Sequence, residues 1–371
     1  MKHPCHPVIR HFKRLAIAAA TLAVAAICRD VFSGDACWPK IHKETNSVYY
    51  WKTVLDFNSD DYEFLRQHKI GRIYLRMFDV DVDITDKADH AHTVPVATMT
   101  MTDRTYAKLH EVLPDMEFVP VVYITCSAIK DAAAYGTGGL ARNIVSRVRN
   151  MCSYNALSRI EALQLDCDWT KTTEQAFFDL CDSVKLQLKE EELDWKLSST
   201  IRLHQLRGHI PPVDYGVLMV YNTGNFNNAD ADNSILSVKD VKPYLKYLEK
   251  YPLHLDVAYP TYSWQLLFRN RRFAGLLNGV NVADTAKFSS LSPDRHVAKT
   301  DVPYRETSIR KGDMIRTEQS DYTTIVRVKK LIERRLDGRP HSNVLYHFDS
   351  RNLSKFSSNE IENLFSTASG K

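Results

Sequence analysis

Residues 162–170 (ALQLDCDWT) constrain the fold and the chemistry of this chain more than any other stretch. Read as a β-strand, the stretch alternates, with Leu163, Leu165 and Cys167 on one face. The opposite face carries Gln164, Asp166 and Asp168. Buried carboxylates are costly unless they are paired. The two aspartates therefore either line a functional site at the end of a barrel strand, or pair with an arginine, or face solvent.

Strand patterns alternate with helix patterns along the rest of the chain, which predicts a parallel sheet. The expected strands are residues 48–51, 72–79, 118–125, 162–170, 197–204, 215–222, 253–259 and 343–349. Most are followed by a helical pattern, and eight such units predict an α/β fold, a (β/α)8 TIM barrel. A long excursion after the seventh strand predicts an insertion between strand 7 and helix 7. A doubly wound open sheet is the second choice, and it would need fewer parallel strands and a glycine fingerprint.

Residues 1–36 have the pattern of a targeting leader with a linker. Lys2, Arg10, Lys13 and Arg14 precede an apolar run from 15 to 27, which is short for a membrane span and typical of a secretory signal. Two interpretations stay open: a lipoprotein leader ending before Cys28, or cleavage after Ala36. Either predicts an exported protein, periplasmic or anchored to the membrane through a lipid on Cys28. Residues 37–371 are then a single barrel domain.

The charge pattern argues against a nucleic-acid partner. The formal net charge is +4, and the basic residues are scattered rather than gathered in a stripe with interleaved aromatic residues. Neither a zinc-finger pattern nor an RNA-binding signature is present in the sequence. We therefore expect no nucleic acid and no cofactor, and we look for the function at the strand ends.

The C-terminal ends of barrel strands converge on one pocket. We predict Asp166 and Asp168 as catalytic residues there. The predicted substrate-binding residues are Trp51, Arg76, Asp79, Trp169, Arg202, His204, Tyr221, Asn222, Tyr259, Trp264, His347 and Asp349. Aromatic faces that stack on the apolar faces of sugars, with carboxylates and amides for the hydroxyl groups, suit a carbohydrate ligand or substrate.

Each group has a structural alternative that the sequence leaves open. Arg76 and Arg202 could be the counter-ions of Asp166 and Asp168. His347 and Asp349 could pair with each other. Likewise, Trp51 and Trp264 could plug the barrel instead of binding a ligand.

Three strand ends resemble motifs of family 18 glycoside hydrolases, the chitinase-like barrels. LQLDCDWT resembles that family's aspartate-rich motif on the fourth strand, LMVYN its Met-x-Tyr-Asp motif, and AYPTYSW its Pro-Phe-Tyr-Gly segment. The resemblance implies that Asp168 matches the aspartate next to the acid, Asp166 the one before it, and Tyr221 the tyrosine that helps to hold the acetamido group. The whole chain also looks like a family of exported bacterial barrel proteins to which we attach no activity.

The chain departs from the family at two positions. The family's proton donor is a Glu two residues beyond the last aspartate, and that position is Thr170. Asn222 stands in place of the sixth-strand aspartate. Glu174 lies four residues further on, where we expect the next helix, and is a poor substitute.

Three hypotheses follow. The first is an exported glycosidase with another acid pair: Asp168 as general acid, its protonated form favoured by repulsion from Asp166, and Asp349 or Asp79 as partner. Same-face residues of a strand lie roughly 6.6 to 7 Å apart, so both stereochemical outcomes stay open. The second is a carbohydrate-binding surface protein without catalysis, which the missing Glu favours. The third, a metal hydrolase using Asp166, Asp168, His204 and His347, lacks any ligand spacing, so we predict no metal.

Overall fold

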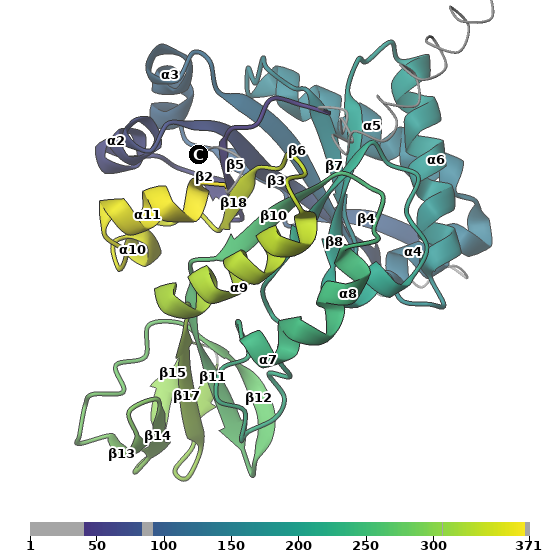
Figure 1. Cartoon of the computed structure of the whole chain (residues 1–371). Coiled ribbons are helices and arrows are strands. Elements are labelled where there is room, and N and C mark those ends of the chain that lie inside the picture. The colour runs from purple at the N-terminus through teal and green to yellow at the C-terminus, as the bar shows by residue number, and fades with distance from the viewer. Residues whose placement is uncertain (1–40, 84–91, 306, 368–371) are drawn as a thin grey trace, which may run out of the picture. The chain divides into compact units, whose positions relative to one another are not determined.

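Eight parallel strands close into a barrel in the computed structural model, which describes residues 41–83, 92–305 and 307–367 (Figure 1). The barrel strands are β1 (Asn46–Tyr50), β3 (Ile70–Asp83), β6 (Glu117–Ile124), β7 (Ala162–Asp166), β8 (Lys196–Arg202), β9 (Tyr215–Met219), β10 (Leu255–Pro260) and β18 (Asn343–Tyr346). β1 pairs in parallel with both β18 and β3, so the sheet has no free edge between them. The predicted (β/α)8 barrel is confirmed, and the open doubly wound sheet is excluded.

Each barrel strand presents one set of side chains to the interior and the other to the surrounding helices. Tyr49 and Tyr74 stack inside the barrel with their ring centroids 4.7 Å apart. The Tyr49 hydroxyl donates to Gln164 Oε1 at 2.7 Å, and Gln164 Nε2 donates to Ser198 Oγ at 3.1 Å. The polar residue predicted in the middle of the fourth strand is therefore buried with both ends of its amide satisfied.

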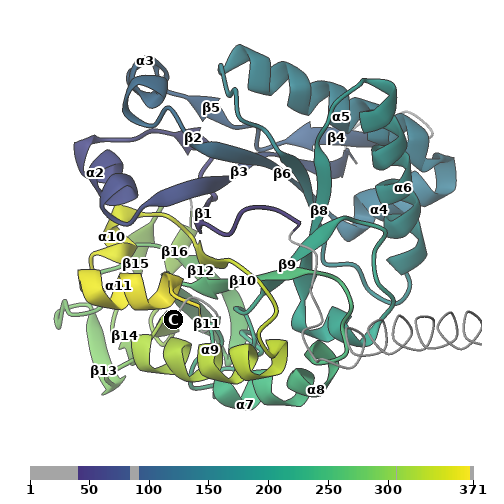
Figure 2. The same cartoon turned by 45° about the horizontal axis from the view of Figure 1, so that its top comes forward.

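Helices cover the outside of the barrel (Figure 2). They are α2 (Ser59–Gln67), α3 (Asp103–Val112), α4 (Cys126–Tyr135), α5 (Thr137–Tyr154), α6 (Glu174–Glu190), α7 (Val238–Val241), α8 (Leu245–Leu248), α9 (Tyr322–Leu336), α10 (Ser350–Leu353) and α11 (Ser358–Phe365). The 3-10 helix η1 (Leu203–Arg207) takes the place of an α-helix directly after β8. Pro243, in η2 (Lys242–Tyr244), separates α7 from α8 because proline cannot donate a helical hydrogen bond. Within the described ranges, no helix combines the length and the apolar character that a membrane crossing requires.

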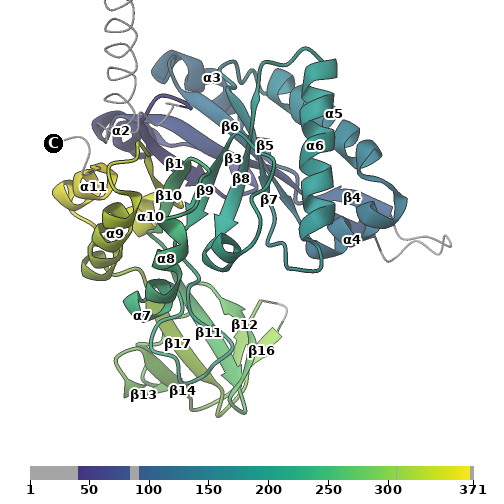
Figure 3. The same cartoon turned by 45° about the vertical axis from the view of Figure 1, so that its right-hand side comes forward.

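The insertion expected after the seventh strand is a separate antiparallel sheet (Figure 3). Its strands are β11 (Ser263–Arg269), β12 (Arg272–Leu277), β13 (Phe288–Ser292), β14 (Arg295–Ala298) and β17 (Met314–Gln319), and a small hairpin is formed by β15 (Val302–Tyr304) and β16 (Thr307–Ile309). The whole insertion lies between β10 and α9. From residue 41 on, the described residues form one compact unit that contains the barrel and this sheet.

A buried glutamate ties the inserted sheet to the barrel loops. Glu318 is fully buried and accepts from Arg316 Nε at 2.7 Å, from Ser234 Oγ at 2.6 Å and from Trp264 Nε1 at 2.7 Å. Ser234 belongs to the loop between β9 and α7, whereas Trp264 and Glu318 lie on β11 and β17. The leader expected in residues 1–36, with Cys28 and Ala36, lies outside the described residues.

Candidate functional site

Two cavities adjoin at the C-terminal ends of the barrel strands. One has a volume of about 780 Å³ and lies between the barrel and the inserted sheet, lined among others by Trp264, Tyr346 and His347. The other has about 320 Å³ and is lined by residues that include Asp168 and Arg202. Asn222 lines both, so together they form one depression, which we call the barrel mouth. Ligand sites of this fold lie at this end.

Asp166 is held by basic and hydroxyl partners deep in the mouth. Its side chain is 4% exposed, and its Oδ1 accepts from Arg202 Nη2 at 2.9 Å and from Thr200 Oγ1 at 2.6 Å. Arg202 is therefore the counter-ion of Asp166, one of the two alternatives predicted for it. Because this charge is neutralised, Asp166 is a weak source of the repulsion that the first hypothesis requires at Asp168.

Asp168 lies just beyond the end of β7 and reaches the solvent. Its side chain is 57% exposed, and its Oδ1 lies 3.5 Å from Nε2 of His204. Both residues line the smaller cavity. Among the residues that the structure describes, Asp168 has no arginine or lysine partner at ion-pair distance, and it is accessible from the mouth.

The position of the family's proton donor offers no carboxylate. Thr170 is exposed, and its hydroxyl lies 2.9 Å from Thr172 Oγ1. Glu174 is the first residue of α6, as expected, and its Oε1 lies 2.6 Å from His209 Nδ1. Glu174 is therefore engaged with the segment after η1 and does not replace the missing acid.

The two partner carboxylates of the first hypothesis are also engaged. Asp79 binds Arg76 through both carboxylate oxygens, with Arg76 Nε at 2.8 Å from Oδ1. Asp349 accepts from Lys52 Nζ at 3.0 Å and from Arg351 Nη2 at 3.0 Å. Burial alone would raise the pKa of Asp349, but these bonds from Arg351 and Lys52 hold it well below its usual value. Asp349 therefore stays ionised near neutral pH and has no proton to donate there, while the Asp79 carboxylate is taken up by its ion pair with Arg76.

Aromatic side chains form a continuous wall around the mouth. Trp51 lies 5.8 Å from Tyr346 between ring centroids, and Tyr346 stacks on Tyr221 at 4.2 Å. Tyr221 meets Tyr262 edge to face at 6.2 Å, and Tyr262 meets Trp264 at 5.5 Å. We call these five residues the aromatic wall. It follows the mouth from β1 across β18 and β9 to the start of the inserted sheet.

Two predicted substrate-binding residues lie outside the mouth. Trp169 is 2% exposed and stacks on Phe177 of α6 at 4.6 Å. Tyr259 is fully buried in the core between the barrel and its helices. The expectation that they face the pocket is therefore wrong. Both follow outward-facing residues by two positions, Cys167 and Val257, so the alternation of the strand places them on the outer face.

The remaining predicted residues do gather at the C-terminal end. Arg76, which the sequence offered as a counter-ion of Asp166 or Asp168, binds Asp79 instead and lies over the Trp51 ring at 5.4 Å. Asn222 Oδ1 accepts from the Tyr262 hydroxyl. His347 lines the larger cavity, and burial lowers its pKa. His347 and Asp349 do not pair with each other, since Asp349 is taken by the two cations.

Several residues of the mouth were not predicted from the sequence. For two of them, the alternation of inward-facing and outward-facing residues along a strand would have predicted the position. Tyr346 comes two positions after Val344, and Tyr123 two positions after Val121, and both valines face the barrel interior. A period of two therefore predicts both tyrosines on the inner face. Tyr262 lies in the loop between β10 and β11, and Lys355 lies in the turn after α10, where the strand period carries no information.

The described residues contain one cluster with the geometry of a metal site, and it is not at the mouth. His42, His254 and Asp256 bring ligand atoms within 4.8 Å of one another. They lie at the opposite end of the barrel, where Asp256 is at the start of β10. The set proposed for a metal hydrolase, Asp166, Asp168, His204 and His347, does not form such a cluster among these residues.

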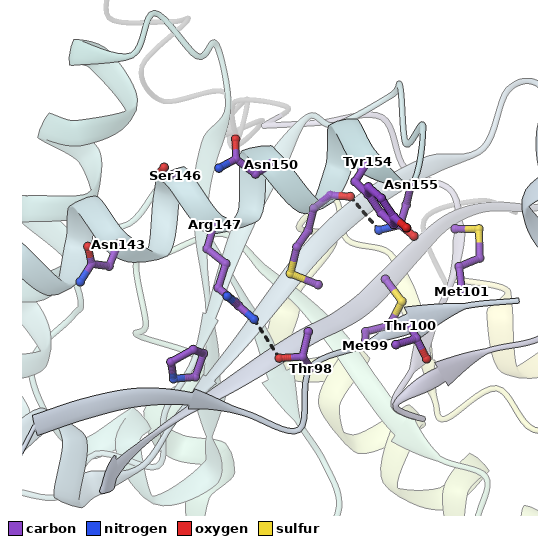
Figure 4. Close-up of a pocket in the computed structure, with 12 residues that line it drawn as sticks. Thr98, Met99, Thr100, Met101, Asn143, Ser146, Arg147, Asn150, Tyr154 and Asn155 are labelled. Carbon is purple, nitrogen blue, oxygen red and sulfur yellow. Dashed lines mark hydrogen bonds between the residues drawn. The ribbon is translucent and has the colours of Figure 1, made fainter. Parts of the chain in front are cut away.

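A third cavity, of about 820 Å³, lies outside the barrel. Figure 4 shows its lining, which comes from one face of α5 and from the segment around Thr98. Arg147 donates to Thr98 Oγ1 at 3.0 Å across this cavity, and the neighbouring groups are amides, hydroxyls and methionines. The lining of this third cavity has no carboxylate. A carboxylate that could act as an acid or a base is therefore found at the barrel mouth and not in the third cavity.

Comparison with known proteins finds similarity in structure. No protein-family model and no curated protein sequence matches the chain. A chitinase, ChiB, from Flavobacterium johnsoniae is similar with a TM-score of 0.49 and 9% identity over 87% of this chain and 94% of that one. The spore cortex-lytic enzyme SleL of Bacillus cereus gives a TM-score of 0.48 and 12% identity over 88% and 75%. A class V chitinase from Nicotiana tobaccum, in complex with NAG4, gives 0.48 and 11% over 88% and 100%.

Proposed function

We propose that this chain is a glycoside hydrolase-like protein that binds a glycan across the barrel mouth. The observation that carries the proposal is the aromatic wall, whose neighbouring rings lie between 4.2 and 6.2 Å apart. Three of its members, Tyr262, Trp264 and Tyr346, line the larger cavity, and Tyr221 lines the smaller one. Pyranose rings present apolar C–H faces that pack on aromatic rings. The Asn222 amide and the charged groups around the wall can orient the hydroxyl groups, as in other pockets that combine apolar walls with a few polar groups.

Binding without hydrolysis is the form of this proposal that the carboxylates favour. Glycoside hydrolysis usually needs two carboxyl groups, one of which donates a proton. Asp79, Asp166 and Asp349 are each bound to a basic side chain, and Thr170 stands where the donor is expected. We therefore infer a carbohydrate-binding protein that has the pocket of a glycoside hydrolase-like barrel but has Thr170 at the position of the proton donor.

Hydrolysis is the second candidate, and one observation favours it. Asp168 is accessible and lies 3.5 Å from His204. A protonated His204 could donate a proton to the leaving oxygen while Asp168 keeps the imidazole oriented.

One experiment separates the two candidates. The full chain is incubated with a broad glycan panel, and both binding and reducing-end release are measured for wild type, Asp168→Asn and His204→Gln. Binding without release supports the binding protein. Release that disappears in both variants would establish a glycosidase, and absence of binding and release would contradict the proposal as a whole.

We also propose that the protein is exported, on the strength of the basic segment followed by the apolar run from 15 to 27. The test is mass spectrometry of the mature chain from fractionated cells. A diacylated N-terminus at Cys28 would establish a lipoprotein, and a chain beginning at Cys37 would establish cleavage after Ala36. A full-length chain in the cytosol would contradict export.

A further inference from the structure

The larger cavity of the mouth carries an excess of positive charge. Its lining contains three basic side chains, Lys52, Arg351 and Lys355, and one carboxylate, Asp349. Three cations against one anion leave an excess of two positive charges. Burial lowers the pKa of His347, the remaining titratable imidazole of the lining, so it adds no charge near neutral pH. We call Lys52, Arg351 and Lys355 the cationic cluster.

Asp349 cannot satisfy this cluster by itself. Its Oδ2 lies 3.0 Å from Lys52 Nζ and 3.0 Å from Arg351 Nη2, and its Oδ1 accepts from Arg351 Nε at 3.2 Å and from the backbone N–H of Arg351 at 3.0 Å. Both carboxylate oxygens are therefore already used. An ammonium has three donors and a guanidinium five, so most of the donors of the cluster remain available.

The side chains that carry these donors line the larger cavity and are partly exposed to solvent. The Lys52 side chain is 41% exposed and that of Arg351 is 80% exposed. Lys355 donates to Ser263 Oγ, a neutral group, at 2.7 Å. Within the described part of the chain, His347 Nδ1 is buried without a hydrogen-bond partner. The wall residues Tyr262, Trp264 and Tyr346 line the same cavity.

We propose that this cavity binds a negatively charged substituent of the glycan, either a carboxylate of an acidic sugar or a sulfate ester. The inference rests on the proposed function and narrows its ligand to acidic glycans. A sugar ring packs on the aromatic wall, and its anionic group binds Arg351 and Lys355, with Lys52 completing the positive field. The guanidinium offers two parallel N–H donors to such an anion, and the ammonium offers a point charge.

The test compares matched oligosaccharides by titration calorimetry with the full chain. The probes are a neutral N-acetylhexosamine oligomer, an oligogalacturonate and a sulfated N-acetylhexosamine oligomer of equal length. We expect one of the acidic oligomers to bind more tightly than the neutral one by a factor of about two to thirty, which is the combined effect of two partly exposed charge contacts. The acidic oligomer that binds more tightly shows whether the site takes a carboxylate or a sulfate ester. The preference should shrink as salt is raised, because exposed charges are screened.

Variants locate the preference in the cationic cluster. The double variant Arg351→Met with Lys355→Met should lose most of the preference for the acidic oligomer. Arg351→Lys, which retains the charge, should keep a measurable part of it. Lys189→Met, on the last turn of α6, removes an exposed charge elsewhere and should leave the preference unaltered.

The outcomes separate this inference from the proposed function. If the neutral oligomer binds as tightly as both acidic ones, the inference is overturned while glycan binding stands. If the acidic preference survives in the double variant, the cationic cluster is the wrong location. If none of the three oligomers binds, the proposed function fails and the inference fails with it.

Discussion

The two aspartates at the end of β7 differ in their surroundings although they lie two residues apart. Asp166 is buried against Arg202 and Thr200, whereas Asp168 lies past the last residue of the strand and is mostly exposed. The alternating pattern predicts that both carboxylates lie on one face. It cannot predict where the strand stops or which arginine is closest, because those depend on β8, a neighbour in space whose register the sequence does not state.

The Asp166–Arg202 pair leads to a stability prediction. Arg202→Met should lower the free energy of unfolding by about 3 to 5 kcal/mol, because it leaves a buried carboxylate without its partner. Urea denaturation measures this. Arg159→Met, which breaks the exposed pair with Asp115, is the matched control and should change stability by about 0.5 kcal/mol or less. Equal effects of the two variants would contradict the structural role of Arg202.

Asp349 gives a pH prediction at the same scale. Because Arg351 and Lys52 bind its ionised form, its pKa in the folded chain lies below the unfolded value, and the stabilisation is present above about pH 4. As the pH falls below that value, the unfolded chain gains the proton first and the stabilisation is lost. Asp349→Asn should therefore be less stable than wild type by about 1 to 3 kcal/mol at pH 7.

The gap between wild type and Asp349→Asn should narrow as the pH falls from about 5 towards 3. Thermal unfolding of both proteins over this range is the measurement. A gap that is constant down to pH 3 would mean that Asp349 is not held ionised by its two cationic partners.

Elements were easier to predict than the side chains at their ends. All eight barrel strands lie where the hydrophobic runs predict them, since a buried parallel strand has a distinctive apolar sequence. Helix α4 follows β6 directly after the cap residue Thr125, so no loop pattern separates these two elements in the sequence. Trp169 and Tyr259 were predicted to line the pocket because they stand at the ends of strands. The alternation of the strand, which decides the face on which a side chain lies, places both on the outer face.

Two tryptophans are predicted to have different roles because Trp169, after β7, is buried against α6, whereas Trp264, on β11, lines the larger cavity. Trp169→Ala should destabilise the fold by about 3 to 5 kcal/mol, because it removes a ring that is buried against Phe177. Trp169→Phe keeps an aromatic ring there and should leave glycan affinity close to that of wild type. Trp264→Phe, in the cavity, loses the hydrogen bond to Glu318 and part of the wall, and should weaken glycan binding.

Unfolding and glycan titration of these three variants form the test. An affinity that falls in Trp169→Phe and is retained in Trp264→Phe would contradict the roles assigned to the two tryptophans.

At the scale of the whole molecule, the inserted sheet converts a barrel end into a walled cavity. The sheet supplies Trp264 and Ser263, and the barrel supplies Tyr346 and Asp349, to the same larger cavity. The sequence predicts the insertion because it interrupts the strand-helix repeat. It does not predict which insertion residues meet the barrel, because the buried contact at Glu318 joins segments far apart in the chain.

The most direct test of glycan binding at the mouth is the affinity of a glycan for three versions of the full chain: wild type, Trp51→Ala with Trp264→Ala, and Tyr154→Ala. Tyr154 lines the cavity outside the barrel and serves as the matched aromatic control. We predict that wild type and Tyr154→Ala bind the best ligand of the panel equally well. The double variant should bind it at least about fivefold more weakly, since each lost aromatic contact contributes about 0.5 to 1.5 kcal/mol. Equal binding by the double variant, or loss of binding in Tyr154→Ala, would contradict the assignment of the barrel mouth as the glycan site.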